Sequence, residues 1–174
     1  DYLTCPLKYR YAHEVQVPLT RSPVFMYGDA VHNAIRVYYQ HRLRGDPIVA
    51  DDVVQAFEQA WSSEGFISRE HEERRLAQGR DALRRFVERE ERHPLTALQV
   101  EQTFKFRRGH DVVEGRWDRI DERDGGIVIV DFKTAEVVRP EDAVKRARDS
   151  LRDSQLGLYA LAYREARGVT PAAV

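Results

Sequence analysis

Three charged residues in the second half of the chain have the types and spacing of a hydrolytic metal site. Asp131 and Lys133 follow the apolar run 127–130, and Asp118 lies before the intervening turn signal ERDGG. Such a run predicts a buried strand, where charge is unusual. Two facing carboxylates repel each other, and a divalent cation such as Mg²⁺ neutralises the pair. A neighbouring lysine can orient a water molecule and stabilise developing negative charge, so the set suits phosphodiester hydrolysis.

The turn between the two strands decides what these residues face. A two-residue loop at Asp124 and Gly125 is a hairpin signal and places Asp118 opposite Asp131. A loop at 125–126 places Asp118 opposite Lys133, and a four-residue loop over 123–126 restores the first pairing. In every even-length loop the three residues project from one face, whereas an odd loop or a bulge removes the arrangement. The alternative is an ordinary, solvent-exposed ion pair at a strand end.

Composition limits the possible classes of protein. The chain has 174 residues, is 42% hydrophobic and 33% charged, and carries a formal net charge of −1, which fits one globular domain. Without a basic excess, any nucleic-acid site must be local. The single cysteine excludes an internal disulfide and an all-cysteine metal site. No apolar run is long enough to span a membrane and no secretory signal is seen, so a cytoplasmic location without membrane partners is expected.

Apolar spacing predicts helices first and a β-meander later. Two short helical turns around Pro6 and a loop over 17–23 precede helices over 26–45, 47–65 and 68–92. Strands are predicted over 98–108, 111–121 and 126–134, and then a long helix over 141–168 that is interrupted near Asp153. The fold class is therefore mixed α/β (α+β). The chain starts inside a helical pattern and ends without a closing element, which suggests a fragment of a larger protein.

Several segments together resemble one family. GRWDRID (115–121) followed by DFK (131–133) resembles the PD-(D/E)XK nuclease superfamily, and more narrowly its RecB-like branch. Members of that branch often follow a superfamily 1 helicase or act in double-strand-break processing. Four further segments resemble motifs of this branch in the same order: YLTCPLKYRY (2–11), GDAVHNAI (28–35), VEQTFKF (100–106) and QLGLY (155–159). The resemblance covers nearly the whole chain and implies one nuclease domain over 1–174.

The resemblance implies a restriction-endonuclease-like core, with a central mixed β-sheet between helices, that binds Mg²⁺ or Mn²⁺. The implied metal ligands are His32, Asp118, Asp131 and the backbone carbonyl of Phe132, with Glu101 as a ligand that family members use variably. Lys133 would be the catalytic lysine, and Gln155 and Tyr159 would contact DNA or the attacking water. The implied function is metal-dependent cleavage of DNA, often at single-stranded ends, in repair or recombination beside a helicase. A catalytically inactive DNA-binding or structural module of a repair helicase is the alternative.

The same residues have structural interpretations. His32 lies on an apolar helix face, where a histidine is often a hydrogen-bonded core residue. Gln155 and Tyr159, at i and i+4, can simply pack together, and a strand glutamate such as Glu101 is usually solvated. Asp121 either supports the site from behind or lies in water near the turn. Two arginine-rich segments, 69–92 and 145–152, either contact phosphates or form solvated faces. For segment 69–92 the solvated interpretation is favoured.

Cys5 occupies the place of the first cysteine of the iron–sulfur cluster that many RecB-like nucleases carry. The other three cysteines of that pattern are absent from these residues. Cysteine followed by proline at this place also occurs in family members without a cluster. No iron–sulfur cluster is therefore expected in this segment.

Overall fold

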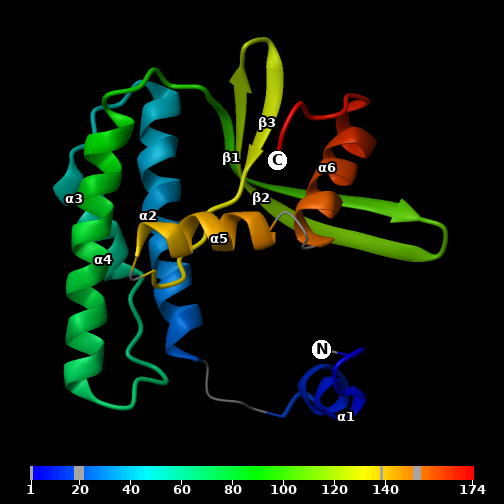
Figure 1. The fold of residues 1–174 in the computed structure, drawn as a ribbon, viewed down its shortest axis with the longest axis horizontal. Helices are drawn as coiled ribbons and strands as arrows, with labels where there is room; N and C mark the ends of the chain where they lie inside the picture. Colours follow the sequence, from blue (N-terminus) through cyan, green and yellow to red (C-terminus); the bar gives the residue numbers. More distant parts are fainter. Residues whose placement is uncertain (1, 18–21, 138, 151–153) are drawn as a thin grey trace.

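The computed structural model describes residues 2–17, 22–137, 139–150 and 154–174, which form helices, then a sheet, then helices (Figure 1). The elements in chain order are α1 (Pro6–Tyr9), the π-helical turn η1 (Arg10–Glu14), α2 (Pro23–Arg44), α3 (Ala50–Gln59), α4 (Arg69–Glu90), β1 (Ala97–Arg108), β2 (Asp111–Arg123), β3 (Gly126–Val130), α5 (Pro140–Ser150) and α6 (Ser154–Arg167). This confirms the predicted mixed α/β class. The predicted loop at 17–23 falls mostly on 18–21, outside the described residues.

The helices α2, α3 and α4 form one layer with its own core. The hydroxyl of Ser22 accepts a hydrogen bond from the Val24 amide, and Pro23 fits the first helical position, so α2 begins before the predicted Met26. Gly45 ends it with a φ of 76°, as a left-handed C-cap requires. Near the end of α2, Leu43 is 39% exposed and does not belong to the buried face of the helix. The core of this layer contains Val31, Ala34, Ile35, Tyr38, Val53, Val54, Phe57, Leu83, Phe86 and Val87.

The sheet has the order β1-β2-β3, and its second hairpin has the predicted two-residue loop. Arg123 pairs with Gly126, and Asp124 and Gly125 both have positive φ, 50° and 74°, as a type I′ turn demands. The ladder continues to Arg119 opposite Val130, where β3 ends. The prediction that this strand extends to 134 is wrong. Asp131 and Lys133 lie just beyond the strand, where the chain leaves the sheet toward the helices.

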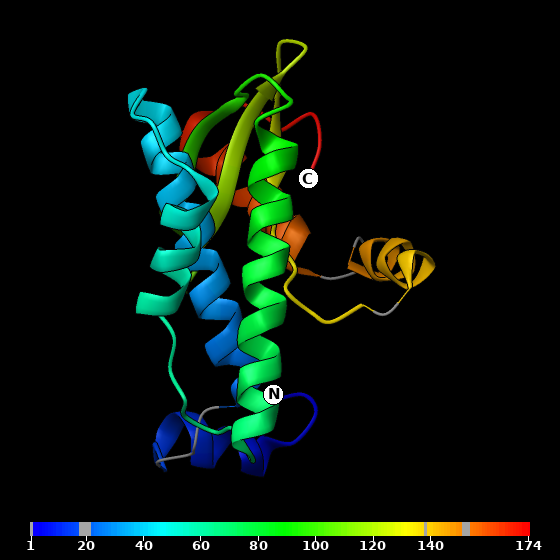
Figure 2. The ribbon, with the colours of Figure 1, turned by 90° about the vertical axis from the view of Figure 1, so that its left-hand side faces the viewer.

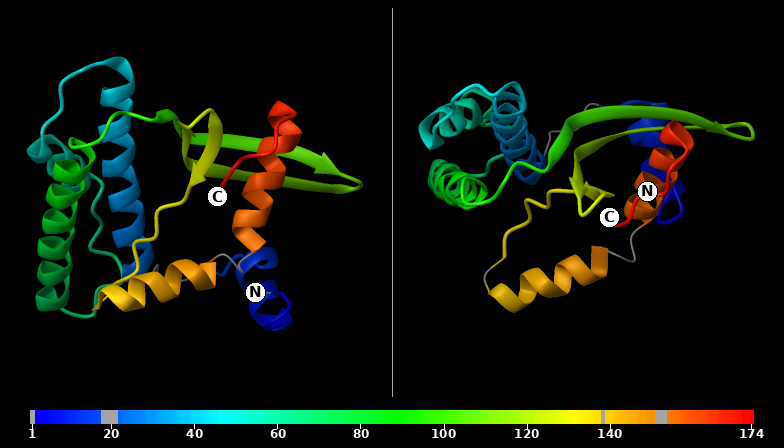
Figure 3. Two further views of the ribbon diagram at one scale, coloured as in Figure 1. Left: turned by 45° about the horizontal axis from the view of Figure 1, so that its top comes forward. Right: turned by 90° about the horizontal axis from the view of Figure 1, so that it is seen from above.

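The long hairpin of β1 and β2 bends at Glu101. This residue has a φ of 51°, a left-handed conformation that is rare for a residue with a side chain. In Figures 1 and 3 the half of the hairpin beside β3 and the distal half run in different directions. The helix α6 covers one face of the distal half and packs on the sheet to form a second core, made of Phe104, Trp117, Ile120, Ile129, Tyr159, Ala162 and Tyr163. This core includes residues on both sides of the bend, since Ile120 pairs with Ile129 of β3.

Two helices occupy the region predicted as one long helix over 141–168. The predicted interruption near Asp153 is consistent with this, although 151–153 lie outside the described residues. Figure 2 shows α5 standing away from the body of the molecule, and none of its residues is buried. Near the last residues, Ala173 forms an isolated parallel bridge with Val128 at the edge of β3.

Candidate active site

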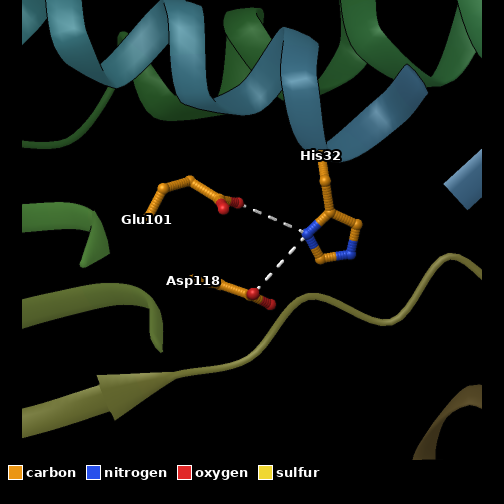
Figure 4. Close-up of side chains that lie close together, drawn as sticks. All are labelled: His32, Glu101 and Asp118. Carbon is orange, nitrogen blue, oxygen red and sulfur yellow. Dashed lines mark ion pairs between the residues drawn. The ribbon is translucent and has the colours of Figure 1, made fainter. Parts of the chain in front are cut away.

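Three side chains from three elements converge on one point. His32 comes from α2, Glu101 from β1 and Asp118 from β2, and one ligand atom of each lies within 4.8 Å of the others. His32 Nδ1 is 3.7 Å from Glu101 Oε1 and 3.6 Å from Asp118 Oδ1 (Figure 4). These distances exceed hydrogen-bond length. The three groups face one another without being bonded, in an open cavity of about 560 Å³.

A close approach of α2 to the segment after β3 positions His32. A Cβ on Gly28 would lie 3.2 Å from Thr134 Oγ1, so glycine leaves room for this segment to pass. His32 is one helical turn further along α2, and its ring is edge-on to that of Phe132, with ring centroids 6.4 Å apart. The segment GDAVHNAI therefore supplies both the glycine that allows this close approach and the imidazole of the site.

Glu101 reaches the site because of the bend in β1. Its carboxylate is 9% exposed, and Arg116 Nε lies 2.5 Å from its Oε2. That contact is an ion pair without hydrogen-bond alignment, since Glu101 Oε2 has no hydrogen-bond partner among the described residues. A left-handed residue with a buried, unsatisfied oxygen is a feature that clusters at functional sites. Glu101 is thus not a solvated strand glutamate.

The two other groups hold their protons more tightly than usual. Burial raises the pKa of the Asp118 carboxyl, and the nearby carboxylates of Asp131 and Glu101 act in the same direction. The amide of Phe132 opposes this by donating a 2.7 Å hydrogen bond to Asp118 Oδ2. The Glu101 carboxylate raises the pKa of His32 more than burial lowers it. Excess negative charge therefore accumulates at this point.

A hydrogen-bonded chain of polar groups runs beside the three ligands. Lys133 Nζ is 2.8 Å from Asp131 Oδ2 and donates a 2.8 Å hydrogen bond to Gln155 Oε1. Gln155 Nε2 donates to the Tyr159 hydroxyl at 2.9 Å. Burial raises the pKa of Tyr159, with Asp118 and Asp131 adding to the effect, so the hydroxyl stays neutral. The Asp131 carboxylate also acts on His32 and Asp118, whose pKa values it raises, and its role as a metal ligand stays a prediction.

A buried ionic cluster lies behind the site. Asp121 is fully buried, not in water as one interpretation expected, and its Oδ1 is 2.8 Å from Arg119 Nε. Arg119 also hydrogen-bonds the Tyr39 hydroxyl and lies over the ring of Phe132, 5.4 Å from its centroid. The second interpretation, support from behind, agrees with this arrangement, because the cluster holds Phe132 beside Asp118.

The donor set suits a divalent metal ion. One imidazole and two carboxylates are ligands that Mg²⁺, Mn²⁺ and similar ions accept. Ligand atoms around one such ion lie about 3 to 4 Å apart, which matches the separations from His32 Nδ1. Glu101 Oε1 and Asp118 Oδ1 are the carboxylate oxygens that face His32 Nδ1, so these two oxygens and the imidazole nitrogen could bind one cation together. The carbonyl of Phe132 as a further ligand stays a prediction.

The cavity is also lined by residues that were not predicted from the sequence. Asp29, Asn33 and Arg36 line it beside His32, and their helical spacing from His32 could have revealed them. Arg116 precedes Asp118 by two positions, so the strand period of two also predicts that it faces the cavity. Tyr159 lines the cavity as the resemblance implied.

Comparison with known protein families gives a match along the whole chain. The model of the PD-(D/E)XK nuclease superfamily matches residues 1–174. No curated protein sequence matches the chain closely enough to count as a relative. In the part of the chain that the structure describes, none of the helices combines the length and apolar character needed to cross a membrane.

Proposed function

The chain belongs to the PD-(D/E)XK nuclease superfamily, and from this premise we propose that it is an active metal-dependent deoxyribonuclease. The observation that carries the proposal is the convergence of His32, Glu101 and Asp118 within 4.8 Å. Mg²⁺ or Mn²⁺ bound by these residues would act as a Lewis acid on a phosphodiester. A module that had lost catalysis would have no need to keep buried acids together at a cost in stability.

The neighbouring side chains have separate roles in this proposal. The ammonium group of Lys133, held by Asp131 and Gln155, stabilises negative charge that develops on the phosphate. Gln155 and Tyr159 fix the direction of that group and offer hydrogen bonds to the attacking water or to the DNA. Asp131 sets the position of Lys133 and adds negative charge beside the metal ligands.

A cleavage assay with matched variants tests the proposal. Labelled single- and double-stranded DNA is incubated with the protein and Mg²⁺, Mn²⁺ or chelator. Asp118→Asn and Lys133→Ala are expected to lose cleavage by at least about a hundredfold. Asp81→Asn, the same change at an exposed position of α4, is expected to cleave normally. Cleavage that persists in both site variants, or in chelator, contradicts the proposal. DNA binding without cleavage by clean wild-type protein would instead support the inactive module.

We further propose that the domain is of the RecB-like type and acts on DNA ends in repair or recombination, beside a helicase domain or subunit. The support is the histidine on α2 and the hydrogen-bonded pair of Gln155 and Tyr159, which correspond to motifs of that branch. Cleavage of linear and circular single-stranded DNA of equal length distinguishes an enzyme that requires DNA ends from one that does not. An end-dependent enzyme degrades only the linear form, and equal cleavage of both forms would exclude a requirement for ends.

A further inference from the structure

The distal half of the β1–β2 hairpin has two chemically different faces. Phe104, Phe106, Val113 and Trp117 pack on the α6 side. Strand side chains alternate, so the residues between them point the opposite way. The register pairs these residues in three rows, and all six are exposed: Thr103 with Arg116, Lys105 with Glu114, and Arg107 with Val112. We call this set the outer hairpin face.

The outer hairpin face is basic although the chain is not. It carries three cationic side chains and one carboxylate, against a formal net charge of −1 for the whole chain. Lys105 Nζ lies 3.0 Å from Glu114 Oε2, with side chains 68% and 70% exposed. An ion pair that exposed contributes little, so a phosphate group can replace the carboxylate. Within the described residues, no carboxylate forms an ion pair with Arg107. Two cations are therefore accessible to an anion.

This face begins at the candidate active site. Arg116 lines the cavity and contacts Glu101, while Lys105 and Arg107 follow in the next two rows toward the tip. Arg107 lies six positions after Glu101, which is about 20 Å of strand. That length equals about six nucleotides of a stacked strand at about 3.4 Å each. Figure 1 shows this part of the hairpin extending beyond α6, away from the helical layer.

We propose that the outer hairpin face binds the phosphate backbone of the substrate nucleic acid, at up to about six nucleotides from the phosphate in the active site. The identity of the substrate rests on the proposed function, whereas the position of the surface rests on the register and the charges. Lys105 and Arg107 make backbone contacts that read no base sequence. They hold the strand along the hairpin and do not touch the reacting phosphate.

The test compares two double variants with the same loss of charge. Lys105→Ala with Arg107→Ala removes the two cations, and Arg74→Ala with Arg92→Ala removes two exposed arginines of the helical layer. The dissociation constant is measured in chelator for a fluorescent single strand of about 20 nucleotides over a series of salt concentrations. The hairpin variant is expected to bind roughly tenfold more weakly, with a log–log salt slope shallower by about 1.4, since each lost contact removes about 0.7. The control is expected to bind like wild type.

Two further measurements make the outcome decisive. Arg107→Lys keeps the charge and is expected to bind like wild type, and thermal unfolding establishes that each variant is folded. In the nuclease assay the hairpin variant is expected to raise KM and to leave kcat unchanged. Equal affinity of the hairpin and control variants overturns the proposal, as does a fall in kcat with unchanged affinity. If wild type binds DNA through this face but never cleaves it, the nuclease function fails and the binding surface stands.

Discussion

At the scale of single residues, the site is defined by charge that its surroundings do not neutralise. Asp118 and His32 both have raised pKa values, one through burial and the other through the Glu101 carboxylate. Groups that bind protons more tightly in the folded state contribute stability that is lost as pH rises through the folded pKa. For His32 this loss begins near its ordinary pKa of 6.5 and for Asp118 near 3.8. In the metal-free domain both groups therefore contribute less to stability as the pH rises.

We expect urea unfolding in chelator to show this dependence directly. Between about pH 6 and about pH 9 the free energy of unfolding of the wild type should fall, because deprotonation of His32 leaves the acids uncompensated. His32→Gln removes the titrating group, so its unfolding free energy should fall less over the same range. Parallel curves for the two proteins would show that His32 does not interact with the acids.

Local sequence patterns predicted the hairpin near the site, but not the contacts that its residues make with distant parts of the chain. The turn signal predicted the two-residue loop and the register as far as Arg119 and Val130, because both are local properties. The predicted pairing of Asp118 with Asp131 lies beyond the end of this ladder. Glu101 was a candidate ligand only through the family resemblance, since its position depends on a left-handed conformation that no residue type signals. The burial of Asp121 depends on Arg119 and on the helices that cover them. Such long-range packing has no local pattern.

At the scale of elements, one helical glycine is required for close packing between helices and another is not. A Cβ on Gly79 of α4 would lie 2.4 Å from the Phe57 ring of α3, whereas nothing lies within 4 Å of the same position on Gly157 of α6. Gly79→Ala should therefore destabilise the protein by about 1 to 3 kcal/mol through overpacking. Gly157→Ala should stabilise it by about 0.5 to 1 kcal/mol, the usual preference of a helix for alanine. Chemical denaturation of both variants measures the contrast, and equal effects would contradict the packing of α3 on α4.

The ionic cluster of β2 gives a second prediction for an element. Asp121→Ala removes the closer ion-pair partner of Arg119, which is 7% exposed and keeps a contact of 3.6 Å with Glu90. Removing one partner of a buried ion pair typically costs about 3 to 5 kcal/mol, so this variant should unfold more easily. Glu73→Ala breaks the exposed pair with Arg69 in α4 and should cost less than about 1 kcal/mol. A small effect of Asp121→Ala in urea unfolding would mean that water reaches the cluster.

Element boundaries show where local patterns lose their predictive value. The long helices and the hairpin turn were predicted because amphipathic spacing and turn residues are strong local signals. The end of β3 at Val130 was not, because Asp131, Phe132 and Lys133 continue an apparent strand pattern. They leave the sheet because Phe132 packs against the helical core. The bridge of Ala173 to Val128 joins segments distant in sequence, and VTPAAV has no strong strand pattern.

At the scale of the whole molecule, the site joins two separate cores. His32 extends from α2, whose other residues form the helical core, while Asp118 extends from β2, which forms the second core with α6. Glu101 lies at the bend of β1. A metal ion bound by these three residues would connect both cores, and such binding stabilises only the state in which the three residues are together.

The two tryptophans allow this connection to be measured. Trp61 packs against the helical core and Trp117 is buried in the second. Trp61→Phe and Trp117→Phe therefore each leave one fluorescent reporter, for the second core and the helical core respectively. Saturating Mg²⁺ or Mn²⁺ should raise the urea midpoint of both reporters together, by about 2.7 kcal/mol at a hundredfold excess over Kd. Asp118→Asn in either background should abolish the shift but keep the acceptor for the Phe132 amide. A shift seen by one tryptophan alone would mean that the metal binds within one core and that the cores unfold independently.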